Sequence, residues 1–170
     1  MIDGVIVTPL ATYPDERGFF REVSRPDDIG TIAAQISHAR RLAGVRNGWH
    51  IHSYHSECFY AANGLMRLAL RDCRIGKPIR VDYPYNNTFG AQVVYGMSGT
   101  PNEYMEVVVG EYDPVIVLVP PGVAHAYRVF SDVDIFYFAT ATYETSRNDE
   151  GRIESVRWPG NDWTRGYEPK

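Results

Sequence analysis

The chain lacks the features that mark several classes of protein. It has no apolar run approaching the roughly 18 residues that a membrane-spanning helix needs. No positive segment leads into an apolar stretch near its N-terminus, as a signal peptide requires. Its net charge of -4 argues against a basic surface for nucleic acid or an anionic membrane. We therefore expect a cytoplasmic protein with no nucleic-acid and no membrane partner.

Cysteine is scarce, and signals for helices are weak. Only Cys58 and Cys73 are present, both inside strand-like runs, so we expect buried thiols and neither a disulfide nor a nucleophile. The best helical candidate, residues 26–32, is short and interrupted by Gly30. The remaining composition, 44% apolar and 22% charged over 170 residues, is typical of a single globular domain.

Short runs rich in β-branched and aromatic residues dominate instead, separated by Gly, Pro, Asn or Asp. They cover residues 4–10, 58–62, 65–70, 92–95, 104–109, 115–119 and 133–138. This pattern predicts an all-β sandwich or barrel, because such folds repeat short strands with regular turns. Residues 75–103 are expected to form an insertion, either a lid or an elaboration without a role. Trp158 and Trp163 predict a tail that packs back on the barrel.

The histidines concentrate in two short stretches of the chain. His50 and His52 alternate along a predicted strand and therefore face the same way. A turn then brings Glu57 beside them, and a later hairpin adds His125. Three imidazoles and one carboxylate suit a divalent transition-metal ion, zinc first, with iron, manganese or nickel as alternatives. There are two other interpretations. The ion could be purely structural, or the histidines could be buried core residues whose hydrogen bonds are made within the protein, with no ion.

These two stretches resemble the two motifs of the cupins. Residues 44–64 match G-x5-H-x-H-x4-E-x6-G, and residues 120–125 match P-x-G-x2-H. The resemblance implies a double-stranded β-helix, the jelly-roll barrel, with His50, His52, Glu57 and His125 as the metal ligands. It implies one domain over 1–170, made of an N-terminal arm and strands over 1–43, a barrel core over 44–143 and a C-terminal extension over 144–170.

A second resemblance covers most of the chain. Residues 15–22 resemble the D-x-R-G-x-F-x-E segment of the dTDP-4-dehydrorhamnose 3,5-epimerases, and residues 45–50 stand in place of their V-L-R-G-L-H. Further similar segments are 120–127 for P-x-G-x-A-H-G-F, Tyr137 and Tyr143 for Y-x5-Y, and 156–159 for I-x-W-P. This resemblance implies a homodimeric isomerase acting on a nucleotide-linked 4-keto-6-deoxy sugar in polysaccharide biosynthesis.

The same resemblance implies roles for particular residues. An arm carrying Arg17, Phe20 and Glu22 would reach into the neighbouring subunit and hold the nucleotide, where arginine donates paired hydrogen bonds to a diphosphate. The alternative is that Arg17 only turns the chain between two strands. Tyr143 would be the acid that returns a proton to the sugar. The remaining expected substrate-binding residues are Gln35, Arg46 and Arg71.

The departures from the epimerases concern the catalytic positions. Those metal-free enzymes use the histidine at position 50 as a base, have a lysine where this chain has Glu57, and have no histidine at position 52. A metal can take the lysine's part, because either group stabilises the charge on an enolate oxygen. The cupin half of the capsular-polysaccharide reductase/epimerases carries the same H-x-H-x4-E pattern. The resemblance to it covers residues 44 to about 143.

If His50 binds a metal, it cannot also take the proton from carbon, and another residue must be the base. The candidates are His55, His38 and Glu57, with His55 the catalytic residue we predict. Two other classes of function remain open at this point. One is a metal-dependent dioxygenase or lyase acting on a small molecule, and the other is a cupin that binds a sugar or metabolite without catalysis.

Overall fold

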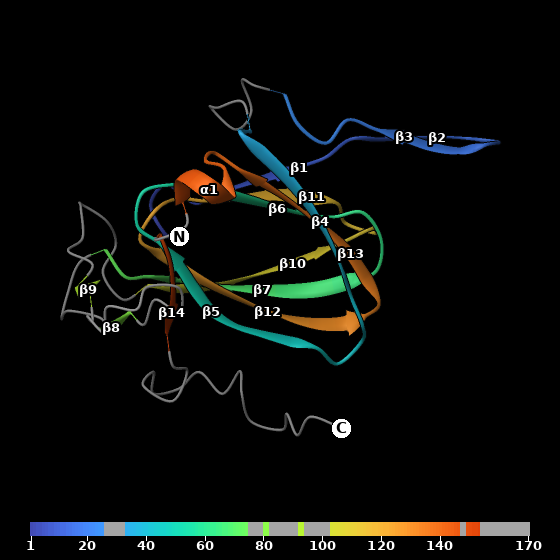
Figure 1. Cartoon of the computed structure of the whole chain (residues 1–170). Coiled ribbons are helices and arrows are strands. Elements are labelled where there is room, and N and C mark those ends of the chain that lie inside the picture. Colours follow the sequence, from blue (N-terminus) through green and yellow to red (C-terminus); the bar gives the residue numbers. More distant parts are fainter. Residues whose placement is uncertain (26–32, 75–79, 82–91, 94–102, 147–148, 154–170) are drawn as a thin grey trace.

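The computed structural model describes residues 1–25, 33–74, 80–81, 92–93, 103–146 and 149–153. Two five-stranded sheets face one another and enclose the interior of a barrel (Figure 1). The strand order is β1-β11-β6-β13-β4 in the first sheet and β10-β7-β12-β5-β14 in the second. All the pairings between these strands are antiparallel. The fold is therefore the jelly-roll barrel of the cupin type that the sequence predicts.

The strands of each sheet come from distant parts of the chain. The first sheet contains β1 (Ile6–Pro9), β4 (Gln35–Arg41), β6 (Glu57–Ala61), β11 (Val115–Val119) and β13 (Val133–Ala139). The second contains β5 (Arg46–His52), β7 (Leu65–Asp72), β10 (Tyr104–Gly110), β12 (Val123–Ser131) and β14 (Glu150–Ile153). The barrel thus uses strands from outside residues 44–143, since β1, β4 and β14 complete the two sheets.

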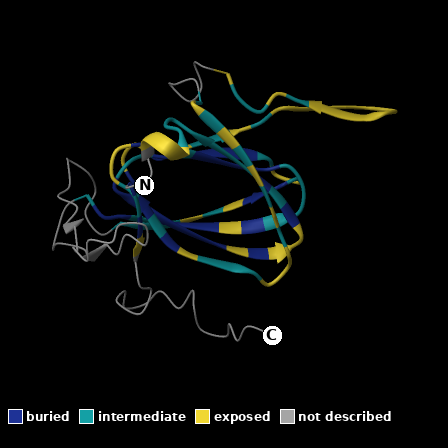
Figure 2. Cartoon of the chain, in the orientation of Figure 1, coloured by how far each residue is buried: buried dark blue, intermediate teal, exposed yellow. Residues whose placement is uncertain are grey.

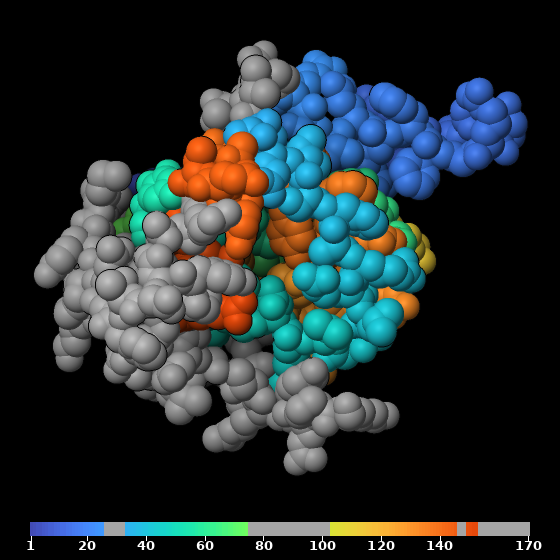
Figure 3. Space-filling model, in the orientation of Figure 1, coloured from blue at the N-terminus to red at the C-terminus, as the bar shows by residue number. Residues whose placement is uncertain are grey.

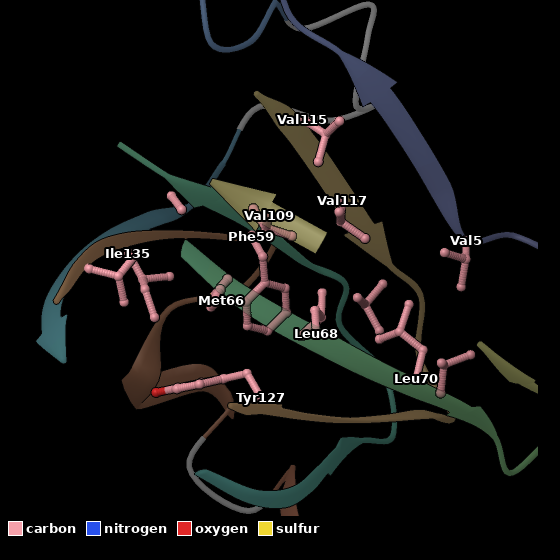
Figure 4. Packing of buried hydrophobic residues seen from close by; sticks show 14 of the residues in the cluster. Val5, Phe59, Met66, Leu68, Leu70, Val109, Val115, Val117, Tyr127 and Ile135 are labelled. Atoms are coloured by element: carbon pink, nitrogen blue, oxygen red, sulfur yellow. The ribbon is translucent and has the colours of Figure 1, made fainter. Parts of the chain in front are cut away.

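The interior of the barrel is apolar over most of its length. Alternate residues of each strand point inward, and Figure 4 shows Phe59, Met66, Leu68 and Tyr127 packed among one another. At one end this pattern changes to polar. The inward positions there carry histidines and Glu57, and we call this polar end of the barrel interior the chamber.

A two-stranded hairpin projects from the barrel. β2 (Thr12–Asp15) pairs with β3 (Gly18–Arg21), and both strands lie well outside the two sheets (Figures 1 and 3). Almost all of this arm is exposed (Figure 2), including Phe20 at 67%. Large exposed aromatic side chains on a projecting hairpin are typical of a surface that another chain covers.

The remaining predictions are only partly open to comparison. The predicted strands appear close to their expected bounds, and Cys58 and Cys73 are buried and free. The predicted helix over 26–32, the two tail tryptophans, and most of 75–103 lie outside the described residues. Of that insertion the structure describes β8 (Arg80–Val81) and β9 (Gln92–Val93), which pair. The one helix of the described chain, α1 (Tyr143–Ser146), is a single turn, and no described helix has the length and apolar character to span a membrane.

Candidate active site

Three histidines line one end of the barrel interior. His50 and His52 lie on β5, and His125 lies on the neighbouring β12 in register with His50. His125 is buried between Val123 and Tyr127, which both face the core. The ring of His125 has its centroid 5.5 Å from that of His52 and 5.9 Å from that of His50. The second sheet therefore presents three imidazoles as one cluster.

Glu57 reaches this cluster from the opposite sheet. It is the first residue of β6, and its Oε2 lies 3.5 Å from His125 Nε2 and 3.8 Å from His52 Nε2. One donor atom from each of His52, Glu57 and His125 lies within 4.8 Å of the other two. We call these three residues the donor triad.

His50 takes a different position from the other predicted ligands. Its Nδ1 lies 2.9 Å from Glu150 Oε1, on the adjacent strand β14. Among the described residues, the groups of close donor atoms that could hold an ion do not include His50. The structure thus brings the four predicted ligands to one end of the barrel, with His50 beside His125 but paired through Nδ1 with Glu150 and not part of the donor triad.

A second carboxylate supports the loop between β5 and β6. Asp149 is 0% exposed and accepts hydrogen bonds from the backbone N–H groups of Ser53 (2.6 Å) and Tyr54 (3.0 Å). Its Oδ2 also contacts His55 Nδ1 and lies 3.8 Å from His52 Nδ1. The His55 ring, whose centroid is 4.1 Å from that of His52, is held against the donor triad.

Sequence analysis did not identify Asp149 and Glu150 as site residues. They stand in a stretch with little periodicity and belong to no recognised motif. Only the pairing of β14 with β5 brings them beside the histidines. The available signal was weak: two adjacent acids just before a short strand-like run.

Burial shifts the protonation equilibria of the donor triad. Burial raises the pKa of Glu57 to about 7, although the nearby His55 opposes the shift. Burial, followed by the neighbouring His55, lowers the pKa of His52 to about 4. Burial and the other histidines hold the pKa of His125 well below its usual value. The two imidazoles are therefore neutral near pH 7, the form that binds a metal, and a cation would favour ionised Glu57.

The donor triad fits a divalent transition-metal ion. Such an ion sits about 2.0–2.2 Å from nitrogen and oxygen ligands, which separates neighbouring donors by roughly 3–3.6 Å. The two Nε2–Oε2 distances of 3.5 and 3.8 Å are close to that spacing and long for hydrogen bonds. The buried Nδ1 atoms of His52 and His125 have no hydrogen-bond partner within the described chain, which is unusual for buried polar atoms. The Nε2–Oε2 distances are consistent with ligands arranged around an ion, whereas the unpartnered Nδ1 atoms lie on the other side of each ring and do not face Glu57.

The two tyrosines of the epimerase-like pattern occupy different places. Tyr143 begins α1 at the rim, is 47% exposed, and its backbone N–H donates to Gln35 Oε1 at 2.7 Å. Tyr137 instead lies inside the barrel, where its ring centroid is 5.3 Å from that of Phe59. Phe59 in turn packs edge-on against His125 at 5.0 Å. Tyr137 is thus one layer beneath the histidine cluster, and Gln35 lies with Tyr143 at the rim.

Several other predicted residues lie away from the cluster. Arg46 is in register with Arg128, an exposed residue on the outer face of the second sheet, because the β5–β12 register shifts between His125 and Tyr127. Arg71 is in register with Ala124, which belongs to the apolar cluster on that same outer face. His38 lies half-exposed on the outside of β4, with its Nε2 2.9 Å from Asp134.

The arm residues also lie far from the histidines of their own chain. Arg17 forms an ion pair with Asp15 at 2.5 Å, and Glu22 pairs with Arg25 at 2.5 Å. Together with Phe20 they remain on the projecting hairpin and the segment that follows it (Figure 3). Within one chain, the contacts of these three residues are with neighbours on the arm and the segment that follows it.

Fold and site together define a protein of the cupin class with a histidine–carboxylate cluster inside its barrel. No protein-family model matches the chain. The chain is 33% identical over 170 residues to the spore coat polysaccharide biosynthesis protein SpsL of Bacillus subtilis (strain 168), covering 98% of this chain and 95% of SpsL. It belongs to the SpsL family.

Solved structures with this fold include a dTDP sugar isomerase and a 3'-monoepimerase. A dTDP sugar isomerase from Desulfovibrio desulfuricans G20 superposes with a TM-score of 0.73 at 16% identity, over 98% of this chain and 94% of that one. ChmJ, a 3'-monoepimerase from Streptomyces bikiniensis in complex with dTDP-quinovose, has a TM-score of 0.73 at 19% identity, over 99% and 79%. At these identities the likeness establishes the fold.

Proposed function

We propose that this chain is a metal-dependent epimerase or isomerase of a nucleotide-linked 4-keto-6-deoxy sugar, acting in the cytoplasm. The observation that carries the proposal is the presence, in one chamber, of both a donor triad and a separate histidine–carboxylate pair, His50 and Glu150. An epimerase of this type needs both an electrophile for the ketone and a base for the adjacent carbon. The family relation to a polysaccharide biosynthesis protein and the shared fold of dTDP-sugar enzymes support it.

In this proposal His52, Glu57 and His125 hold the ion, with zinc the first candidate. When bound, the ion polarises the 4-keto oxygen and stabilises the charge that develops there as the neighbouring C–H bond breaks. The donor set of two imidazoles and one carboxylate leaves coordination positions for substrate or water. Glu57 stands where the metal-free epimerases have a lysine. In this proposal it is a metal ligand and does not act as a base.

His50 is the base that this geometry favours. Its Nδ1–H donates to Glu150 Oε1, which leaves Nε2 with a free lone pair. A neutral imidazole oriented in this way can take the proton from C3 or C5 of the sugar. Since His50 lies outside the donor triad, it keeps the lone pair that a fourth metal ligand would lose. His55 is the alternative base, because Asp149 orients its ring in the same manner.

The acid must act on the other face of the sugar, since inversion requires protonation opposite the base. His50 belongs to the second sheet, whereas Tyr137 belongs to β13 in the first sheet. A sugar held between the sheets would therefore have His50 on one side and Tyr137 on the other. We propose Tyr137 as the acid and retain Tyr143, which lies at the rim, as the alternative.

Solvent exchange tests this function directly. The purified chain would be incubated in deuterated water with dTDP- and UDP-linked 4-keto-6-deoxy sugars, while NMR follows C3 and C5. We expect deuterium at one or both carbons, with inversion. Binding of a nucleotide sugar without any exchange would point to a non-catalytic sugar-binding cupin instead.

A second candidate function rests on the donor triad itself. Two histidines and one carboxylate with open positions are also the ligand set of non-haem iron oxygenases. Iron in the purified protein, with oxygen uptake on addition of a small organic substrate, would favour a dioxygenase. Zinc content with thermal stabilisation by dTDP or UDP would favour the epimerase.

The arm leads to a prediction about subunits. We propose a homodimer in which Arg17, Phe20 and Glu22 of one chain serve the chamber of the other, since within one chain their contacts are with neighbours on the arm and the segment that follows it. Arg17→Ala is expected to weaken nucleotide-sugar binding about 10- to 100-fold, the equivalent of a charge-assisted hydrogen bond. At a substrate concentration too low for the Arg17→Ala chains to bind, mixing Arg17→Ala and His50→Gln chains should restore roughly a quarter of wild-type activity, because half the re-formed dimers carry one intact site.

The matched control for this arm experiment is Glu16→Ala, which changes the exposed neighbour of Arg17 and should leave binding unchanged. Subunit exchange is checked by mixing chains of two different masses. Subunit exchange without recovered enzyme activity would show that each arm serves the site of its own chain or no site.

A further inference from the structure

A chain of three polar side chains lies beneath the histidine cluster. Arg41, the last residue of β4, donates through Nε to the Tyr127 hydroxyl at 3.0 Å. The hydroxyls of Tyr127 and Tyr137 are 3.1 Å apart. Tyr127 belongs to the second sheet, and Arg41 and Tyr137 to the first. The chain of hydrogen bonds therefore crosses the barrel interior and ends at Tyr137, which packs against Phe59 beneath the histidine cluster.

The chemistry of these groups gives the hydrogen bonds a direction. A guanidinium only donates, so the Tyr127 oxygen must accept from Arg41. Either hydroxyl can donate in the Tyr127–Tyr137 contact; in the arrangement that leaves the Tyr137 hydrogen free, Tyr127 donates to the Tyr137 oxygen. The hydrogen of Tyr137 then has no acceptor among these three side chains and can be donated into the chamber. Donation from Arg41 occupies the Tyr127 oxygen as an acceptor and so favours Tyr127 as the donor to Tyr137.

Arg41 also differs from its neighbour Arg40 in its ion pairing. Arg40 points outward and is paired with Asp134 at 2.9 Å and Asp132 at 3.4 Å. Arg41 points inward, partly buried, and across the described part of the chain no carboxylate lies within ion-pair distance of it. Its polar contacts there are the Tyr127 hydroxyl and the Arg40 carbonyl (3.1 Å). Burial raises the pKa of Tyr137, and the charge of Arg41, which has no counter-ion here, opposes that shift.

We propose that Arg41 and Tyr127 are positioning residues that set Tyr137 as the proton donor; this inference rests on the proposed epimerase function. In the step, the Tyr137 O–H bond breaks and a C–H bond forms on the face of the sugar opposite His50. The electron pair left on the Tyr137 oxygen is stabilised by the hydrogen bond from Tyr127 and by the charge of Arg41. Water returns a proton to Tyr137 and takes one from His50 before the next turnover.

The experiment separates the two proton transfers. In deuterated water, return of a deuteron from the His50 face gives exchange without inversion, whereas protonation by Tyr137 gives inversion. Arg41→Gln and Tyr127→Phe are expected to keep the exchange rate within about threefold and lower the rate of inversion at least 10-fold, as loss of part of a general-acid contribution predicts. Arg41→Lys keeps the charge and should recover part of the inversion.

Arg40→Gln is the matched control, since it removes an arginine from the outer face of the same strand and should keep the wild-type ratio of inversion to exchange. Thermal unfolding of each variant checks that it folds, and Tyr127→Phe serves if Arg41→Gln does not. An unchanged ratio in the folded Arg41 and Tyr127 variants would overturn this inference while leaving the proposed function intact. A wild-type chain that exchanges no deuteron with any sugar would remove both.

Discussion

Replacing His125 by alanine is expected to reduce the bound metal from about one ion per chain to near zero. His125 contributes one of three close donor atoms, and two remaining ligands bind a divalent ion weakly. The variant should also lose the thermal stabilisation that the ion gives the folded state. Elemental analysis after gentle purification measures the first effect, and thermal unfolding with and without chelator measures the second.

His38→Ala is the matched control, because His38 lies on the outer face of β4 and outside the donor triad. Its metal content should equal that of the wild type. His50→Ala distinguishes three ligands from four: retention of the ion supports the donor triad, and its loss supports the four-ligand prediction from sequence. A wild-type protein that carries no transition metal, and binds none when it is supplied, would contradict the site altogether.

His50→Gln is expected to slow deuterium exchange by about 10²–10⁴-fold, the usual contribution of a general base, while leaving the bound ion in place. Glutamine keeps a polar side chain of similar size but cannot take the proton from carbon. Glu150→Gln, which retains a hydrogen bond to His50 Nδ1 but removes the charge, should slow exchange less. NMR of the exchanging carbon measures both rates under saturating substrate.

The control for this second prediction is His55→Gln, which alters the alternative base. If His55→Gln abolishes exchange and His50→Gln does not, then His55, supported by Asp149, is the base. If both variants retain normal exchange and inversion, neither histidine takes the proton. Metal analysis of each variant separates an effect on the base from an effect on the ion.

The sequence alone was sufficient for the fold and for part of the site. Alternating β-branched and aromatic residues between turn residues predict strands, because each residue's own preference and the two-residue period agree. The same period predicts that His50 and His52 share a face, and the turn after β5 brings Glu57 close. These features depend on residues near one another along the chain, so a linear pattern contains them.

The tertiary structure alone decided which residues complete the site. Glu150, and Asp149 just before it, reach the histidines because β14 pairs with β5, a contact over about 100 residues that no local pattern encodes. The register shift between β5 and β12 places Arg46 on the outer face. The contact between His50 and Glu150 likewise comes from this strand pairing. Strand pairing and register are properties of the whole sheet, and a change of one residue in register reverses the face that a side chain occupies.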